Sequence, residues 1–141
     1  MLFSSDRASL RRMYLEAWRR SRDALPLEPV QAQIADVITL HPEYHAVLES
    51  GDEALETDWQ GSDGQSNPFL HMGMHLAIRE QAATDRPAGI AAIHRRLSER
   101  LGDAHAAEHL MMECLAAVLW EAQQHARAPD ESYYLEALRR L

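Results

Sequence analysis

The residues best suited to chemistry in this sequence are histidines spaced four apart. The chain has eight histidines among 141 residues, and three pairs follow the i, i+4 spacing: His41/His45, His71/His75 and His105/His109. A step of four residues is slightly more than one helical turn, so both members of such a pair lie on one helix face. Two imidazoles in that arrangement can bind one metal ion. The spacing therefore indicates metal ligands on helices.

Two of these pairs lie in stretches that are almost entirely apolar. The segment FLHMGMHLAI, residues 69–78, has only His71 and His75 as polar side chains. The segment AHAAEHLMMECLAAVLWEA, residues 104–122, contains three polar residues in steps of four, namely His105, His109 and Glu113. A helix that is apolar on all sides is buried, and a buried imidazole or carboxylate is costly unless it is paired or bound to a metal. We therefore expect an interior His/Glu site.

The predicted metal ligands are His45, His71, His75, His105, His109 and Glu113. Nitrogen and oxygen donors suit a divalent transition metal such as Zn, Fe, Mn or Ni, and the set is large enough for one or two ions. An ion with an open position can activate water or bind oxygen. The sequence thus predicts a metal-binding helical protein, either a metal-dependent hydrolase or an oxygen-binding centre. Whether His45 joins the site stays open, because Pro42 interrupts its helix.

An alternative reading needs no metal. Buried histidines and glutamates can satisfy one another in a hydrogen-bonded network. The protein would then be a non-enzymatic interaction or regulatory module. The surface expected to bind an acidic protein partner, or to support a homodimer, is the basic face of the first helix, with Arg11, Arg12, Arg19 and Arg20. The sequence leaves open whether the protein is an enzyme. His94, beside two arginines, is expected to be a solvated surface residue.

The composition excludes several classes of partner. The formal net charge is −8, which disfavours nucleic acids and anionic membranes because binding to both depends on basic surfaces. No stretch is long and apolar enough to predict a membrane-spanning helix. Cys114 is the single cysteine, so a Cys-rich zinc site is excluded and a reducing compartment is indicated. We expect a cytoplasmic protein.

The elements that must position these residues are all predicted to be helices. We expect one domain over residues 1–141, an all-α bundle of about six helices with a long loop at residues 50–67 that Trp59 anchors. Proline, glycine and capping residues divide the chain at predictable points. The expected helices are one capped at Ser4–Asp6 and ending before Pro26, one from Pro29, a short one at 42–48, and others at 68–84, 88–101, 104–124 and 133–141.

Four blocks of the sequence carry a family resemblance. They are HPEYH at 41–45, NPFLHMGMHLAIREQ at 67–81, HAAEHLMMECL at 105–115 and WEAQ at 120–123. With these blocks the chain resembles a bacterial family known as domain of unknown function 1841. The resemblance implies a small cytoplasmic protein and no particular activity. The HxxxH and HxxxE spacings are also similar to those of hemerythrin-like and DinB-like bundles, although the order of the elements differs from hemerythrin.

Overall fold

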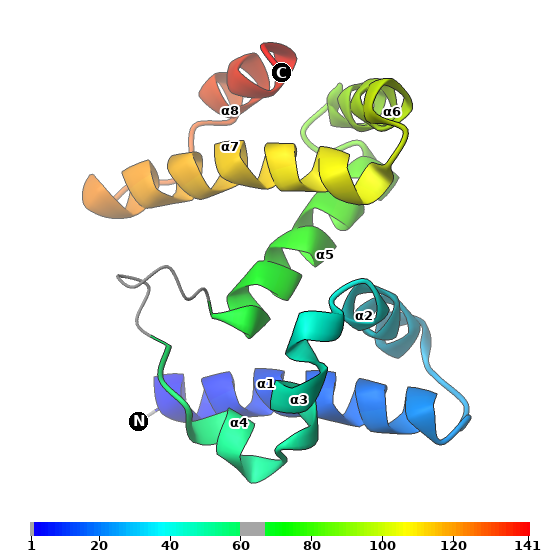
Figure 1. The fold of residues 1–141 in the computed structure, drawn as a ribbon. Coiled ribbons are helices and arrows are strands. Elements are labelled where there is room, and N and C mark those ends of the chain that lie inside the picture. Colours follow the sequence, from blue (N-terminus) through cyan, green and yellow to red (C-terminus); the bar gives the residue numbers. More distant parts are fainter. Residues whose placement is uncertain (1, 60–66) are drawn as a thin grey trace. The chain divides into compact units, whose positions relative to one another are not determined.

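The computed structural model describes residues 2–59 and 67–141, with side chains from residue 7 onward. Within these residues the chain forms eight α-helices and one 3-10 helix and has no strand, which confirms the all-α fold (Figure 1). The helix without a counterpart among the expected ones is α4 (Asp52–Glu56), which lies in the predicted loop. The chain divides into two compact units, residues 1–73 and 74–141, and the boundary falls inside one helix. The expectation of a single domain stays a prediction.

The first unit is built on its N-terminal helix. Helix α1 (Leu2–Arg22) packs against α2 (Pro29–Thr39), α3 (His45–Glu49) and α4 (Asp52–Glu56). A 3-10 turn, Pro42–Tyr44, joins α2 to α3. The buried residues of this unit include Ala17, Ile34, Ala35, Val37, Ile38, Leu48, Ala54 and Leu55. The buried residues of α2, from Ile34 to Ile38, therefore form the face of this helix that is turned to the core.

Two predictions for this unit are wrong. The first helix begins at Leu2, so the expected cap at Ser4–Asp6 lies inside the helix. The predicted loop contains helix α4, which Gly51 begins with a positive φ of 70°. That conformation costs glycine little, so a helix can start there. The rest of the loop prediction, residues 60–66, lies outside the described residues.

Arg11 ties α4 and the chain after it to α1. Its side chain is only 2% exposed. Nη1 donates hydrogen bonds to the carbonyls of Ala54, Leu55 and Thr57, at 3.1, 3.2 and 2.8 Å. Its guanidinium also lies over the Trp59 ring, 5.0 Å from the centroid. The prediction that Arg11 belongs to an exposed basic face is therefore wrong, because the carbonyls ending α4 bury it.

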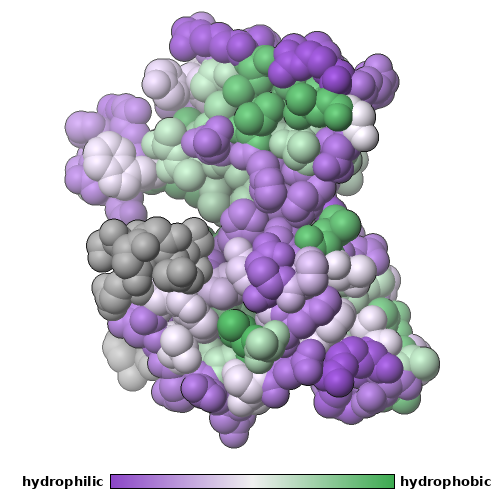
Figure 2. All heavy atoms as spheres, viewed as in Figure 1, coloured by the Kyte–Doolittle hydropathy of each residue, from purple (hydrophilic) through white to green (hydrophobic). Residues whose placement is uncertain are grey.

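The second unit contains the end of α5 (Pro68–Thr84) together with α6 (Ile90–Leu101), α7 (Ala104–Gln124) and α8 (Glu131–Arg139). Helices α6 and α8 both pack on α7 and on each other (Figure 1). Their core is formed by Ile78, Ile90, Ile93, Leu97, Ala107, Met111, Met112, Leu115, Val118, Tyr134 and Leu138. Apolar side chains also gather at the surface between α6 and α8 in Figure 2.

The predicted signals at Asn67, Gly102 and Asp103 are confirmed, whereas α6 begins at Ile90 and not at the expected residue 88. Asn67 Oδ1 accepts the backbone N–H groups at the start of α5. Asp103 caps α7, and Gly102 ends α6 with a φ of 69°. The last helix begins two residues before the predicted Tyr133, because the Asp130 side chain accepts the Tyr133 N–H as its cap. In the described part of the chain, no helix has the length and apolar character needed to cross a bilayer.

Candidate metal centre

Three histidines of the second unit come together at the junction of α5 and α7. The ring centroids of His75 and His105 are 4.6 Å apart, those of His75 and His109 are 4.8 Å apart, and those of His105 and His109 are 4.4 Å apart. One ring nitrogen of each lies within 4.8 Å of the corresponding nitrogens of the others. His75 is fully buried, His105 is half-buried and His109 is exposed. The group thus runs from the interior to the surface.

The start of α7 fixes two of these histidines. Asp103 Oδ1 accepts the backbone N–H of His105 at 3.0 Å, which sets where the helix begins. His105 and His109 then lie one turn apart on the same side of the helix. His75 comes from α5, a 17-residue helix that is apolar along most of its length. The sequence spacing therefore puts His105 and His109 on one face of α7. His75 joins them through the packing of α5 near α7.

A buried carboxylate orients the innermost imidazole. Glu108, 2% exposed, accepts a hydrogen bond from His75 Nδ1 at 2.9 Å. An ionised carboxylate can only accept, so Nδ1 carries the proton. In a neutral imidazole, Nε2 then holds the lone pair that a metal needs. This is the arrangement by which outer carboxylates fix the tautomer of metal-binding histidines and raise their basicity.

Two further groups hold Glu108 in its charged form. Arg79 Nε donates to both carboxylate oxygens, at 3.1 and 3.3 Å, and His94 Nε2 lies 3.3 Å from Oε2. Burial alone would raise the pKa of Glu108. The hydrogen bonds from His75 and His94, together with the charge and hydrogen bond of Arg79, outweigh burial and hold this pKa well below its usual range.

The spacing of the three imidazoles suits one metal ion after a small adjustment. Zinc–nitrogen bonds of about 2.0–2.1 Å in a tetrahedron place ligand nitrogens about 3.4 Å apart. The nitrogens of His75, His105 and His109 lie within 4.8 Å, so they must approach by up to about 1.4 Å to reach that spacing. Rotation of the exposed His109 side chain can supply much of this movement, since solvent leaves it room.

The other three predicted ligands are not members of this group of the second unit. His71 and His45 belong to the first unit, where His71 meets His41 edge-on with centroids 5.0 Å apart. His45 packs on Trp18, centroids 4.3 Å apart, and its Nε2 donates to the Ile38 carbonyl at 2.9 Å. Glu113 is exposed on α7 and is not among the clustered residues. Within the second unit, the structure thus brings together three of the six predicted ligands.

Three residues of the site were missed in the sequence: Arg79, His94 and Glu108. The expectation for His94 is wrong, because its side chain is 21% exposed and contacts Glu108. The steps of four residues that predicted the ligands do not include Glu108. A signal was present: at 100° per residue Glu108 falls with Met112 and Leu115 on the apolar face of α7, whereas Glu113 falls opposite.

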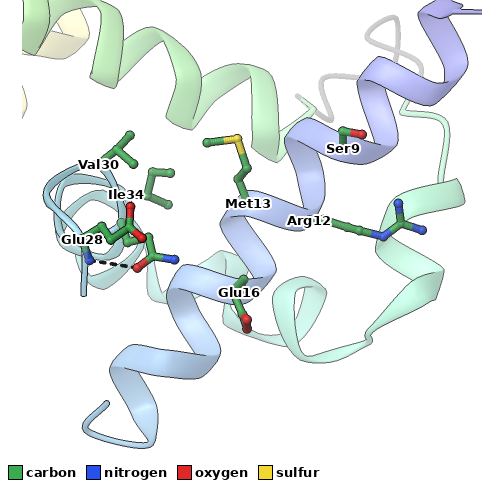
Figure 3. Close-up of a pocket in the computed structure, with 8 residues that line it drawn as sticks. Ser9, Arg12, Met13, Glu16, Glu28, Val30 and Ile34 are labelled. Atoms are coloured by element: carbon green, nitrogen blue, oxygen red, sulfur yellow. Dashed lines mark hydrogen bonds between the residues drawn. The ribbon is translucent and has the colours of Figure 1, made fainter. Parts of the chain in front are cut away.

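A groove of the first unit has a different chemistry. A groove of about 360 Å³ runs between α1 and α2 and is lined by Ser9, Arg12, Met13, Glu16, Glu28, Val30, Gln31 and Ile34 (Figure 3). Val30, Ile34 and Met13 supply its apolar wall, while Arg12 and Glu16 stand along α1. The exposed Glu16 is paired with Arg19 at 2.7 Å. This groove has no imidazole or thiol in its lining, so the histidine cluster is the stronger candidate for a functional centre.

Comparison with known proteins assigns the family. A model of the family described as domain of unknown function (DUF1841) matches residues 6–140, so the chain belongs to this family. No curated protein and no solved structure matched the chain. The predicted membership of this family is therefore confirmed.

Proposed function

We propose that this DUF1841 protein binds one divalent transition-metal ion through His75, His105 and His109. The observation that carries the proposal is the cluster itself: three ring nitrogens within 4.8 Å, one of them on an imidazole that a buried carboxylate orients. Imidazoles brought together in this way are the usual donors for such ions. The second unit alone supplies these three ligands.

The donor set favours some metals over others. Three imidazole nitrogens suit Zn, Fe or Ni, whereas Mn prefers oxygen ligands. Glu113 is not a member of the described cluster, and Glu108 is held by His75, Arg79 and His94. Neither carboxylate therefore adds the oxygen ligand that Mn would need. We accordingly propose one ion, of Zn, Fe or Ni.

The chemistry at this centre follows from the number of protein ligands. Three ligands from this unit leave room for an exogenous ligand on the ion, as in catalytic zinc sites. A bound Zn or Ni ion supplies Lewis acidity and lowers the pKa of a bound water, and Fe can bind oxygen. A metal-dependent hydrolase or an oxygen-binding centre is thus the proposed activity class. We propose a cytoplasmic location on the grounds of the single cysteine.

A second function draws on the hydrogen bonds of Glu108. The network of His75, Arg79, His94 and Glu108 is consistent with a structural role without metal. The protein would then act as an interaction module. Arg12, which lines the groove of Figure 3, would contact an acidic partner or a second copy of the chain. Arg19 is already paired with Glu16, and Arg20 Nε donates to the Pro26 carbonyl, so the basic face is smaller than expected.

Elemental analysis of protein purified without a histidine tag separates the two functions. The informative variant is His109→Ala, because His109 is exposed and its loss should leave the fold intact. The matched control is His125→Ala, an exposed histidine at the other end of α7. The metal-binding function predicts stoichiometric metal in wild type and in the control, and loss of metal from His109→Ala. Equal metal content in all three proteins would refute the site.

A further inference from the structure

Arg79 places a positive charge directly behind the proposed metal ligands. Its Nε donates to both oxygens of Glu108, which in turn accepts from His75 Nδ1. The Arg79 side chain is 30% exposed and that of Glu108 is 3% exposed. The guanidinium is therefore one carboxylate removed from an imidazole of the cluster, and it is partly shielded from water.

The charges around the centre do not cancel. Imidazoles bind a metal as neutral ligands, so a divalent ion held by three of them keeps its two positive charges. The negative charge of Glu108 is offset by the positive charge of Arg79. Among the described residues, no carboxylate is part of the cluster, and Glu113, expected to be a ligand, is not among its members. These residues thus supply no anionic ligand of the kind that reduces the charge of many metal sites.

We propose that the metal centre takes an anion, or the anionic group of a substrate, as its exogenous ligand, and that Arg79 strengthens this binding by cancelling the charge of Glu108. This inference rests on the proposed metal site and adds the class of molecule that it binds. An anion that binds in a partly desolvated site interacts more strongly with the surrounding charges than it would in water. An anion should therefore bind at this centre more tightly than a neutral molecule of similar size.

A purely structural role of Arg79 predicts a different result. If Arg79 only held Glu108 in place, its removal would misplace His75 and weaken the binding of metal and anion together. If its charge matters, removal leaves Glu108 uncompensated behind the ligands. The metal is then held as tightly or more tightly, while the anion is repelled. Removal of Arg79 should therefore lower the metal affinity if its role is structural, and leave it equal or raise it if its charge matters.

The experiment uses the full chain loaded with Co²⁺ as a spectroscopic probe. Cobalt content is measured first for wild type, Arg79→Gln, Arg79→Lys and the control Arg96→Gln, an exposed arginine of α6. Each protein is then titrated with azide, and with imidazole as a neutral ligand, while the visible absorption is followed. Wild type should bind azide with a change in the cobalt bands.

The expected pattern is specific to charge. Arg79→Gln should bind azide about tenfold more weakly, as expected for charges on the order of 10 Å apart at an effective dielectric constant of about 20. Its affinities for cobalt and imidazole should not fall. Arg79→Lys should keep most of the azide affinity, and Arg96→Gln should match wild type because an exposed charge is screened.

Three results would overturn the inference. Cobalt-loaded wild type whose spectrum does not respond to azide would refute it while leaving the metal site in place. Equal azide affinity in wild type and Arg79→Gln would refute the role of Arg79. Failure of the wild type to bind cobalt would refute the proposed metal site itself, and the anion site with it.

Discussion

Replacing Glu108 by glutamine should destabilise the metal-free protein, because one buried carboxylate holds three basic side chains. The substitution keeps the shape of the side chain and removes its charge. Glu108 is 2% exposed and accepts from His75, Arg79 and His94. The three partners do not contribute equally, because their exposure to water differs. The size of the effect follows from that difference.

His75 should dominate the loss. It is fully buried and cannot turn to water, so its hydrogen bond to a charged acceptor accounts for about 1.5–3 kcal/mol. Arg79 and His94 are 30% and 21% exposed, and each can reach solvent when the carboxylate is removed. Their pairs contribute less, on the order of 0.5 kcal/mol each. The oxygen of the glutamine amide can still accept a hydrogen bond and so recovers part of the lost stabilisation. We therefore expect a loss of about 2–3 kcal/mol in the free energy of unfolding.

Urea denaturation at neutral pH, in the presence of a chelator, measures this loss without any metal contribution. The matched control is Glu121→Gln on the same helix. Glu121 pairs with Arg127 at 3.1 Å, the same distance as the Arg79–Glu108 pair, but its side chain is 41% exposed. The control should lose less than about 1 kcal/mol. A Glu108→Gln variant as stable as the control would refute the claim that this carboxylate organises the centre.

Other predictions follow from the same structure. Since its contacts hold the pKa of Glu108 below the usual range, its stabilisation is present above the unfolded-state pKa of about 4.3 and fades as the pH falls further. The stability gap between wild type and Glu108→Gln should therefore narrow below about pH 4, as chemical denaturation across pH would show. Arg11→Met removes three hydrogen bonds to carbonyls at the end of α4 and should cost about 2–4 kcal/mol, whereas Arg12→Met should change the unfolding midpoint little. Burial, and then the charge of Glu113, raises the pKa of the Cys114 thiol; iodoacetamide at pH 7 should alkylate it several-fold more slowly in the folded than in the urea-unfolded chain.

The helices could be predicted from the sequence because their limits are set locally. Asn67 with Pro68, Gly102 with Asp103, and the proline at position 29 each act within one turn of a helix end. The start of α1 could not be placed in this way. A residue that can cap a helix can also lie inside one, and here the helix continues through Ser4–Asp6 to Leu2. Local signals thus predict most helix ends, but not an end where the same residues can either cap the helix or extend it.

The centre could be predicted only in part because it depends on packing between helices. The i, i+4 spacing identified His105 and His109, and the apolar character of α5 identified His75. The same spacing suggested Glu113, which the packing of α7 leaves exposed, and it could not suggest Glu108, which is one residue before His109 but faces the core. Arg11 was misplaced for a similar reason: nothing near it in the sequence shows that the carbonyls ending α4 lie beside it.

The most direct test of the metal centre is a calorimetric titration of the metal-free protein with Zn²⁺ or Ni²⁺. The structure predicts one site for each chain. Alanine substitution of His75, His105 or His109 should each weaken binding by at least about a hundredfold, since each removes a direct ligand. Glu113→Ala should bind as wild type does. Unaltered affinity in the three histidine variants, or no binding by the wild-type protein, would contradict the account.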